Sequence, residues 1–409
     1  MLRGFVAALL GVCAYYISTL DLTLPYPAQR FKFDAIDPAT LPLDNSPLEG
    51  VYASNEILRK AHKLFDGVIA SSETVTVSPE GNLTLVDKYG YVYEAEPAAG
   101  VPGAVFPNEW ALDLPAAYYV GPGRPLGFHH DSAGNLIIAD TLKGLLRLDR
   151  ASGAVEVLTA RVSPDAAVDA GSPLAYVNDI DIDHDSGVIY FSDAQSIPVY
   201  PDRETGTFYD TFQSYLLGFI GGNVAGRLCR YDPATRRTEV LLKGLWFANG
   251  VALAADKSYV AVVETNRLRV HRYWLSGPRA GSSDLLIERL PGFPDGISRA
   301  PDGNLWVALV APVTGLPKLL KNKVARFLLA YLPAWARPRI PRWGAALKVS
   351  AAGQPLQLLM DPDGSHIAFV SSVTEVAGRL YFGNVRMNYV SYIDLKDVPP
   401  QHAEGRQEA

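Results

Sequence analysis

Four oxygen-bearing side chains lie at nearly the same distance before a turn that leads into an apolar run. The offset is eight residues in three cases and nine in the other, and the pairs are Glu73 and Gly81, Asn178 and Gly187, Asn249 and Lys257, and Asp295 and Gly303. If these segments are equivalent strands of a repeating β unit, equal offsets place the four side chains at one height around a common axis. Two carboxylates and two amide oxygens then converge, a ligand set that suits Ca²⁺.

The repeat extends beyond these four segments. Two further segments, around Gly134 and Gly378, share the pattern and make six units. Each turn is followed by a run rich in β-branched or aromatic residues and then by a second short run, and Gly, Asp and Ser bound the runs. Such runs are typical of strands joined by hairpins. Six units of about four strands predict an all-β fold, a six-bladed β-propeller, with a pair of β-sandwiches as the alternative.

Composition and charge narrow the class of protein. A chain of 409 residues usually forms two or three domains, but a propeller can exceed that prior as a single unit. Hydrophobic residues make up 48% of the chain, which is ample for a core, and the net charge of -6 argues against a nucleic-acid groove. Cys13 and Cys229 are the only cysteines, and one lies in the apolar N-terminal stretch, so no structural disulfide is expected.

The N-terminal segment predicts a membrane anchor. Arg3 is followed by seventeen uncharged, mostly apolar residues, which is close to the shortest segment that spans a bilayer. No small-x-small cleavage motif follows Leu20, which favours an uncleaved signal anchor over a signal peptide and places the propeller on the extracytoplasmic side, whether periplasmic, lumenal or extracellular. The predicted parts are the anchor at 1–20, a linker with a short helix around Ala53 to Leu64 at 21–66, the propeller at 67–398 and a polar tail at 399–409.

A basic segment interrupts the fifth predicted blade. Residues 316–343 contain seven Lys or Arg and no acidic residue, and apolar residues recur at helical spacing through Leu328 until Pro333 ends the run. The pattern predicts a basic amphipathic helix that, with Trp335 and Trp343, could lie on an anionic membrane surface and roof the mouth of the site. The alternative is a solvated helical insertion that packs on the propeller rim.

The chain resembles a known family in four segments that occur in register. They are GRPLGFHHDSAGNLIIADTLKGLLRLD, YVNDIDIDHDSGVIYFSDA, FANGVALAADKSYVAVVETNRLRVHRYWLSG and FPDGISRAPDGNLWVAL. Here the chain is similar to the strictosidine synthase-like proteins, which include the adipocyte plasma membrane-associated proteins and are related to regucalcin, gluconolactonase, paraoxonase and diisopropylfluorophosphatase. The similarity covers approximately residues 67–395. It implies a six-bladed propeller with one catalytic divalent ion, usually Ca²⁺, in the central channel.

The resemblance also implies roles for particular residues. It gives the metal the same four ligands, Glu73, Asn178, Asn249 and Asp295, and makes Asp295 a general base or nucleophile as well. Turn positions remain the alternative for these four, because Asn often caps turns and Asp295 precedes a glycine. His129 and His130 lie where a paraoxonase-like proton shuttle would sit. Strand alternation lets at most one of the two rings face the channel, and a hairpin histidine without a catalytic part is the alternative.

Departures from the family refine the predicted chemistry. Ser371 falls near the position of the catalytic glutamate of strictosidine synthase, and serine cannot perform that proton transfer, so a condensing activity is disfavoured. Leu126, Phe128 and Phe247 predict a less polar pocket than that of the sugar lactonases. The sequence thus predicts a membrane-anchored, Ca²⁺-dependent hydrolase of moderately apolar esters or lactones, of arylesterase or lactonase type. The alternative is a non-catalytic binding or scaffold propeller that keeps the ion for structure.

Overall fold

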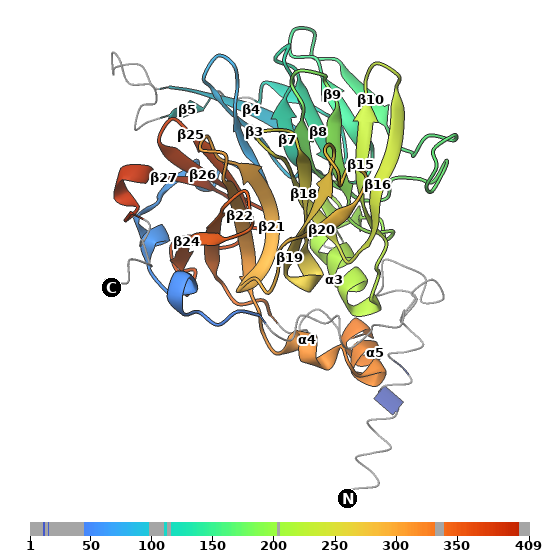
Figure 1. Ribbon diagram of the computed structural model, residues 1–409. Helices are drawn as coiled ribbons and strands as arrows, with labels where there is room; N and C mark the ends of the chain where they lie inside the picture. Colours follow the sequence, from blue (N-terminus) through green and yellow to red (C-terminus); the bar gives the residue numbers. More distant parts are fainter. Residues whose placement is uncertain are drawn as a thin grey trace, which may run out of the picture.

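The chain forms a six-bladed β-propeller. The computed structural model describes residues 11–12, 15, 45–97, 110–112, 116–202, 205–331 and 339–400. Within these ranges six antiparallel sheets are arranged around a central axis (Figure 1), and nearly every strand pairs with the strand next to it in sequence. This confirms the predicted all-β propeller and excludes a pair of sandwiches. The predicted anchor at residues 1–20 and the predicted tail at 399–409 lie almost wholly outside the described residues.

The first three blades are formed by strands β2 to β16. The first contains β2 (Val75–Val77), β3 (Leu83–Val86), β4 (Tyr91–Pro97) and β5 (Trp110–Leu112), with β6 (Tyr118–Tyr119) also paired to β4. The second contains β7 (Pro125–His130), β8 (Leu136–Asp140), β9 (Gly144–Leu148) and β10 (Val155–Thr159). The third contains β11 (Val177–Ile182), β12 (Ile189–Asp193), β15 (Gly226–Asp232) and β16 (Arg237–Leu245).

The remaining blades complete the ring. The fourth contains β17 (Ala248–Leu253), β18 (Tyr259–Glu264), β19 (Arg269–Trp274) and β20 (Ser283–Ile287). The fifth contains β21 (Gly292–Arg299), β22 (Leu305–Pro312), β23 (Gly344–Val349) and β24 (Pro355–Asp361). The sixth contains β25 (Val370–Val376), β26 (Arg379–Asn384), β27 (Val390–Asp394) and β1 (His62–Leu64).

The N-terminal strand closes the ring. β1 pairs with β27 in antiparallel register, with Lys63 opposite Ser391, so the outer strand of the last blade comes from the start of the propeller. The propeller therefore begins at His62 rather than at residue 67. β1 lies within residues 21–66, which the sequence predicts to be a linker. In place of one helix around Ala53 to Leu64, the structure has two short 3₁₀ helices, Gly50–Tyr52 and Ile57–Lys60.

Local turn chemistry and burial explain why the blades form. All six predicted turn positions join the first and second strands of a blade, and five of them are glycines with positive φ. Lys257 takes the sixth position with φ of 57°, a strained conformation for a side-chain-bearing residue. Strands in the middle of a blade are buried on both faces, as in β8, whose residues are all buried. Two-sided burial accounts for their unbroken apolar runs.

Helices α3, α4 and α5 lie at one end of the propeller (Figure 1). α3 (Thr211–Gly221) follows the small hairpin of β13 (Tyr200–Pro201) and β14 (Tyr209–Asp210), and α4 (Leu316–Leu319) and α5 (Lys323–Tyr331) lie between β22 and β23. Short 3₁₀ helices follow β18 (Thr265–Arg267) and β27 (Leu395–Asp397). Within the described ranges, no helix is long and apolar enough to cross a membrane.

Candidate functional site

The predicted ligand positions coincide with a repeated bulge in the inner strands. In β7, β11, β17 and β21 the pairing register with the next strand shifts across two residues at the same place, and these residues are 126–127, 178–179, 249–250 and 295–296. A bulge redirects side chains that would otherwise follow strand alternation. Asn178, Asn249 and Asp295 thus occupy equivalent positions, and Glu73 lies two residues before β2.

Close approach of neighbouring inner strands explains the glycines that follow Asn249 and Asp295. A Cβ on Gly250 would lie 2.3 Å from the backbone nitrogen of Ile297, and one on Gly296 would lie 2.5 Å from the carbonyl oxygen of Ser371. No side chain fits at these distances, so glycine is required where the bulges of adjacent blades meet. The glycine at 296 is therefore a packing requirement of this ring.

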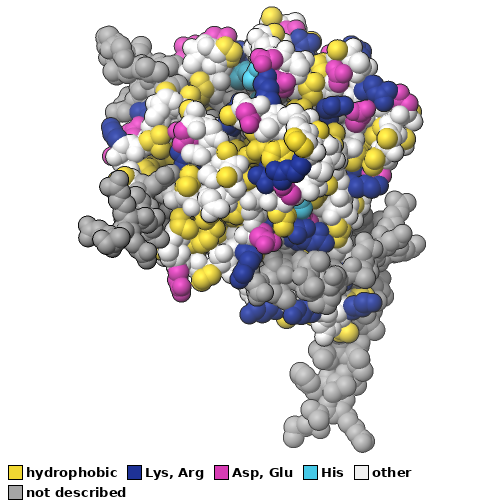
Figure 2. Space-filling model, viewed as in Figure 1, with side chains coloured by type: hydrophobic (Ala, Val, Ile, Leu, Met, Phe, Trp, Pro, Cys, Tyr) yellow, Lys and Arg dark blue, Asp and Glu magenta, His cyan; other side chains and the backbone are white. Residues whose placement is uncertain are grey.

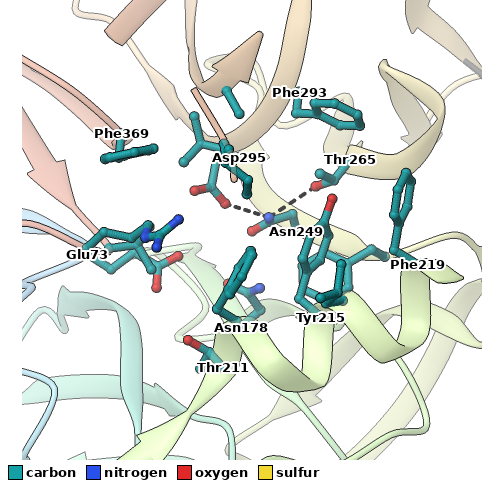
Figure 3. A pocket seen from close by; sticks show the side chains of 18 of the residues that line it. Glu73, Asn178, Thr211, Tyr215, Phe219, Asn249, Thr265, Phe293, Asp295 and Phe369 are labelled. Atoms are coloured by element: carbon teal, nitrogen blue, oxygen red, sulfur yellow. Dashed lines mark hydrogen bonds between the residues drawn. The ribbon is translucent and has the colours of Figure 1, made fainter. Parts of the chain in front are cut away.

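The structure brings the four predicted ligands together at the floor of one pocket. Glu73, Asn178, Asn249 and Asp295 all line it and are buried. Their polar groups lie around a common space, while Phe293, Phe369 and residues of α3 stand around it (Figure 3). The walls are mostly apolar and include the aromatic side chains of Phe212, Tyr215, Phe219, Phe247, Phe293 and Phe369.

Three oxygens of this floor are buried without a hydrogen-bond partner. They are Glu73 Oε2, Asn178 Oδ1 and Asn249 Oδ1. Asn249 is oriented by its amide nitrogen, which donates to Asp295 Oδ1 at 2.5 Å and to Thr265 Oγ1 at 3.1 Å (Figure 3). Buried polar groups are normally paired. Unpartnered acceptors that converge beside a carboxylate fit a hard cation, which takes oxygen ligands of these types.

The chemical types of the four floor side chains determine which metal the site favours. In the described part of the chain, no cluster of three or more His, Cys, Asp or Glu could hold a metal. The pocket floor instead combines two carboxylates with two amide oxygens. An all-oxygen set without nitrogen or sulfur favours Ca²⁺ or Mg²⁺ over Zn²⁺.

The two carboxylates of the floor are held in an unfavourable environment for negative charge. Burial raises the pKa of Glu73 well above its ordinary value, and the charge of Asp295 adds to this shift while the charge of Arg124 opposes it. Burial also raises the pKa of Asp295 to about 7, although the hydrogen bond from Asn249 lowers it. Neither carboxylate forms an ion pair with any residue that the structure describes. A bound cation would remove this electrostatic cost.

Two aromatic wall residues hold strained backbone conformations. Phe247 has φ of 69° and Phe369 has φ of 57°, and both line the pocket. Each lies two residues before an inner-strand position of the ring, Asn249 in one case and Ser371 in the other. Side-chain-bearing residues in this region cost about 1–3 kcal/mol and are common at binding sites. Both strained residues therefore belong to the wall of the candidate site.

The two predicted catalytic histidines lie elsewhere. Neither His129 nor His130 is among the residues that line the pocket, because both lie at the far end of β7 from Leu126, which does line it. His130 is buried, with Nε2 3.0 Å from Thr84 Oγ1, and burial lowers its pKa to about 4. Burial also lowers the pKa of His129, which lies near Asp181 and His184. The bulge of β7 thus presents Leu126, not a histidine, to the floor.

The other positions singled out by the sequence divide between pocket and core. Leu126 and Phe247 line the pocket, whereas Phe128 is buried in an apolar cluster with Ile138 and does not. Ser371 occupies the inner-strand position of the sixth blade, and its hydroxyl donates to the carbonyl oxygen of Glu73 at 2.7 Å. It is not among the lining residues and acts as a structural support for Glu73.

Several pocket residues were not predicted from the sequence. Phe212, Tyr215 and Phe219 come from α3, whose start is marked by Asp210, an N-cap that accepts from the backbone nitrogen of Gln213. An Asp before an apolar run that ends in glycines is a recognisable helix signal. Thr265 and Arg386 carry no such signal, because each follows a strand end and reaches the pocket only through the fold.

The fold is shared with solved six-bladed propellers. Among solved structures, a gluconolactonase of Xanthomonas campestris superimposes with a TM-score of 0.55 at 15% sequence identity, covering 83% of this chain and 93% of that one. At this level of identity the comparison shows a shared fold.

Sequence comparison is more specific. A family model described as strictosidine synthase matches residues 178–278. Strictosidine synthase-like protein 10 of Arabidopsis thaliana is 37% identical over 284 residues, which are 67% of this chain and 70% of that protein. Adipocyte plasma membrane-associated protein of Bos taurus is 29% identical over 411 residues, covering 96% of this chain and 92% of the relative. The chain belongs to the strictosidine synthase-like family.

Proposed function

We propose that the protein is a Ca²⁺-dependent hydrolase of moderately apolar esters or lactones, with the ion held by Glu73, Asn178, Asn249 and Asp295. One observation carries this proposal. Three acceptor oxygens of these residues are buried without a partner beside the Asp295 carboxylate, at the floor of an apolar pocket. The gluconolactonase among the structural neighbours supports a hydrolytic activity for a propeller of this shape.

The residues of the floor have separable roles in this proposal. An ion bound there would polarise a carbonyl or phosphoryl oxygen of the substrate and stabilise negative charge that develops on it. Asp295 is the candidate general base or nucleophile, and the Asn249 amide fixes the position of its carboxylate. Ser371 holds the backbone that carries Glu73. His129 and His130 take no part, because neither lines the pocket.

The pocket walls favour an apolar substrate. Leu126 stands at the floor position of the second blade, and aromatic rings form much of the wall. Such walls bind the apolar body of a ligand, while a few polar groups fix its orientation. Ser371, in the sixth blade, supplies no proton-transfer group to the pocket, which argues against a strictosidine synthase-like condensation.

We also propose that the protein is attached to a membrane. The relative named as plasma membrane-associated supports membrane association. We assign the tether to residues 1–20, followed by a linker, and place the propeller of 67–398 with β1 on the extracytoplasmic side. These assignments rest on the charge and apolar content of the N-terminal residues.

The test is hydrolysis by the full-length protein of a panel comprising phenyl acetate, an apolar γ-lactone and a phosphotriester, with Ca²⁺ or with EGTA. Turnover of the ester or the lactone should disappear with EGTA and fall by roughly 1,000-fold in Asp295→Asn, because one carboxylate supplies both a metal ligand and the reacting group.

Asp284→Asn is the matched control. Asp284 loses the same charge but lies on β20, where it pairs with Arg272 and Arg279, and it should leave turnover unchanged. No turnover of any substrate by a protein that binds Ca²⁺ would refute the hydrolase and indicate a binding or scaffold propeller with a structural ion.

A further inference from the structure

The helical insertion of the fifth blade has two apolar faces, and only one of them is covered. On α5, Leu329 and Ala330 are buried in the large apolar cluster formed by blades four and five. Val324, Phe327 and Leu328 are exposed to 66%, 41% and 58%. Phe327 and Leu328 follow Val324 by three and four residues, so both are its neighbours on the helix surface. A helix that is apolar on opposite faces is normally buried on both.

The exposed apolar face continues onto α4. Leu319 is exposed to 47%, so four large apolar side chains within ten residues face outward in this part of the chain. Lys318, Lys321 and Lys323 are exposed among them. Figure 2 shows Lys and Arg side chains, with apolar atoms between them, at the end of the molecule where α4 and α5 lie in Figure 1. The "α4–α5 face" below means these four apolar and three lysine side chains.

A buried arginine fixes the orientation of this face. Arg326 is 2% exposed, and its guanidinium donates to the carbonyl oxygens of Ile220 at 2.7 Å and Gly221 at 2.6 Å. These carbonyls end α3 and would otherwise lack helical partners, and a cation is favourable at the C-terminus of a helix. The α4–α5 face is therefore anchored to the propeller rather than free to fold back.

The charge of the segment indicates what covers the face. Residues 316–343 contain no Asp or Glu, although the chain as a whole has a net charge of -6. A cationic rim around exposed apolar side chains matches a bilayer surface that contains anionic lipids, where apolar groups enter the acyl boundary and lysines contact headgroups. In a two-fold dimer through this face the same lysines of both copies would meet, and their like charges disfavour that contact.

The α4–α5 face adjoins the mouth of the pocket. Pro317 of α4 lines the pocket, as do Thr314 before the helices and Arg339, Ile340 and Pro341 after them. From the other side α3 contributes Phe212 and Leu216. A surface that contacts α4 and α5 would therefore lie against the pocket entrance.

We propose that the α4–α5 face docks on an anionic lipid surface and holds the pocket mouth against it. Docking is independent of the proposed hydrolase activity. Entry of apolar substrates into the pocket directly from the lipid follows only if that activity is also correct.

The experiment uses the full-length protein in phosphatidylcholine vesicles with and without about 30% phosphatidylserine. An environment-sensitive fluorophore is attached at Leu328→Cys or, as the control site, at Val157→Cys on β10, both in a Cys13→Ser background. Cys229 is buried and does not compete for the label. Val157 is 51% exposed, close to the exposure of Leu328, and it lies on the outer strand of the second blade.

The proposal predicts a blue-shifted emission and several-fold stronger quenching by nitroxide-labelled lipid at position 328 than at position 157. The difference should grow with phosphatidylserine and shrink when Lys318, Lys321 and Lys323 are all changed to Glu. A water-exposed probe at 328 in tethered protein would overturn the proposal. A shift that occurs without vesicles and grows with protein concentration would assign the face to a second copy. An equal response to neutral and anionic vesicles would overturn the anionic-lipid assignment.

Discussion

Glu264 and Asp295 are buried acidic side chains in neighbouring blades, yet their surroundings are opposite. Glu264 contacts Arg267 at 2.5 Å, Arg269 at 2.6 Å and His271 at 2.8 Å, and it accepts from the backbone nitrogen of Trp246. Burial alone would raise its pKa, but these partners outweigh burial and lower the pKa to about 2. Asp295 has one amide donor, from Asn249, and its pKa rises to about 7.

The difference separates a structural carboxylate from a functional one. The charge of Glu264 is neutralised by the chain itself, so its site is complete when the protein folds. Neither Glu73 nor Asp295 forms an ion pair with a described residue, and the charge of Arg124 offsets the burial of Glu73 only in part. The amide oxygens of Asn178 and Asn249 beside them have no donors. Buried carboxylates without partners are unfavourable unless a ligand compensates their charge. Carboxylates in a pocket with strongly perturbed pKa values therefore indicate a ligand site.

The largest effect on the free energy of unfolding is expected at Glu264, and it tests the contrast with Asp295. Glu264→Gln removes the anion but leaves Arg267 and Arg269 partly buried beside it, so the free energy of unfolding should fall by about 3–5 kcal/mol. Urea unfolding measures the change. Asp284→Asn, which breaks a more exposed pair with Arg272 and Arg279, should cost less than about 1 kcal/mol. Equal effects of the two variants would contradict the assignment of Glu264 as a structural centre.

The contribution of Glu264 should also depend on pH in a defined window. Its folded-state pKa of about 2 lies below the ordinary value of 4.5, so the stabilisation is complete above pH 4.5 and is lost as pH falls toward 2. The difference in unfolding free energy between the wild type and Glu264→Gln should therefore narrow across this window. A difference that stays constant from neutral pH to pH 2 would show that the anion is not its source.

A smaller effect of opposite sign is expected at Asp295. In Ca²⁺-free protein, Asp295→Asn removes a buried charge while Asn keeps an oxygen that can accept from Asn249, so unfolding free energy should rise by roughly 1 kcal/mol. Added Ca²⁺ should stabilise the wild type and not the variant. Thermal unfolding with EGTA and with Ca²⁺ measures both. A destabilised Ca²⁺-free variant would make Asp295 a structural residue like Glu264.

The structural features that could be predicted from the sequence are those that repeat from blade to blade. The turn followed by an apolar run identified six blades, and the nearly constant distance from four of these turns to an oxygen-bearing residue identified the four floor residues. A bulge recurs at this place in β7, β11, β17 and β21. Asn178 and Asn249 occupy matching bulge positions, which explains why their offsets from the following turn differ by only one residue.

Features that do not repeat were missed or misplaced. β1 has only three residues, HKL, and its strand identity depends on pairing with β27, at the other end of the chain. His129 and His130 have suitable chemistry, but the floor position of β7 is Leu126, three residues before the first and four before the second. Phe128 is in the core although Phe247 is in the pocket, since the two differ in their position relative to the bulge.

The most direct test of the central claim is calorimetric titration of Ca²⁺-free protein with Ca²⁺ at neutral pH. The wild type and Asp284→Asn should each bind one ion per chain, and Asp295→Asn should bind at least about 100-fold more weakly, because it loses a charged ligand. Absence of binding to the wild type, or unchanged affinity in Asp295→Asn, would contradict the proposal that the pocket floor is a calcium site.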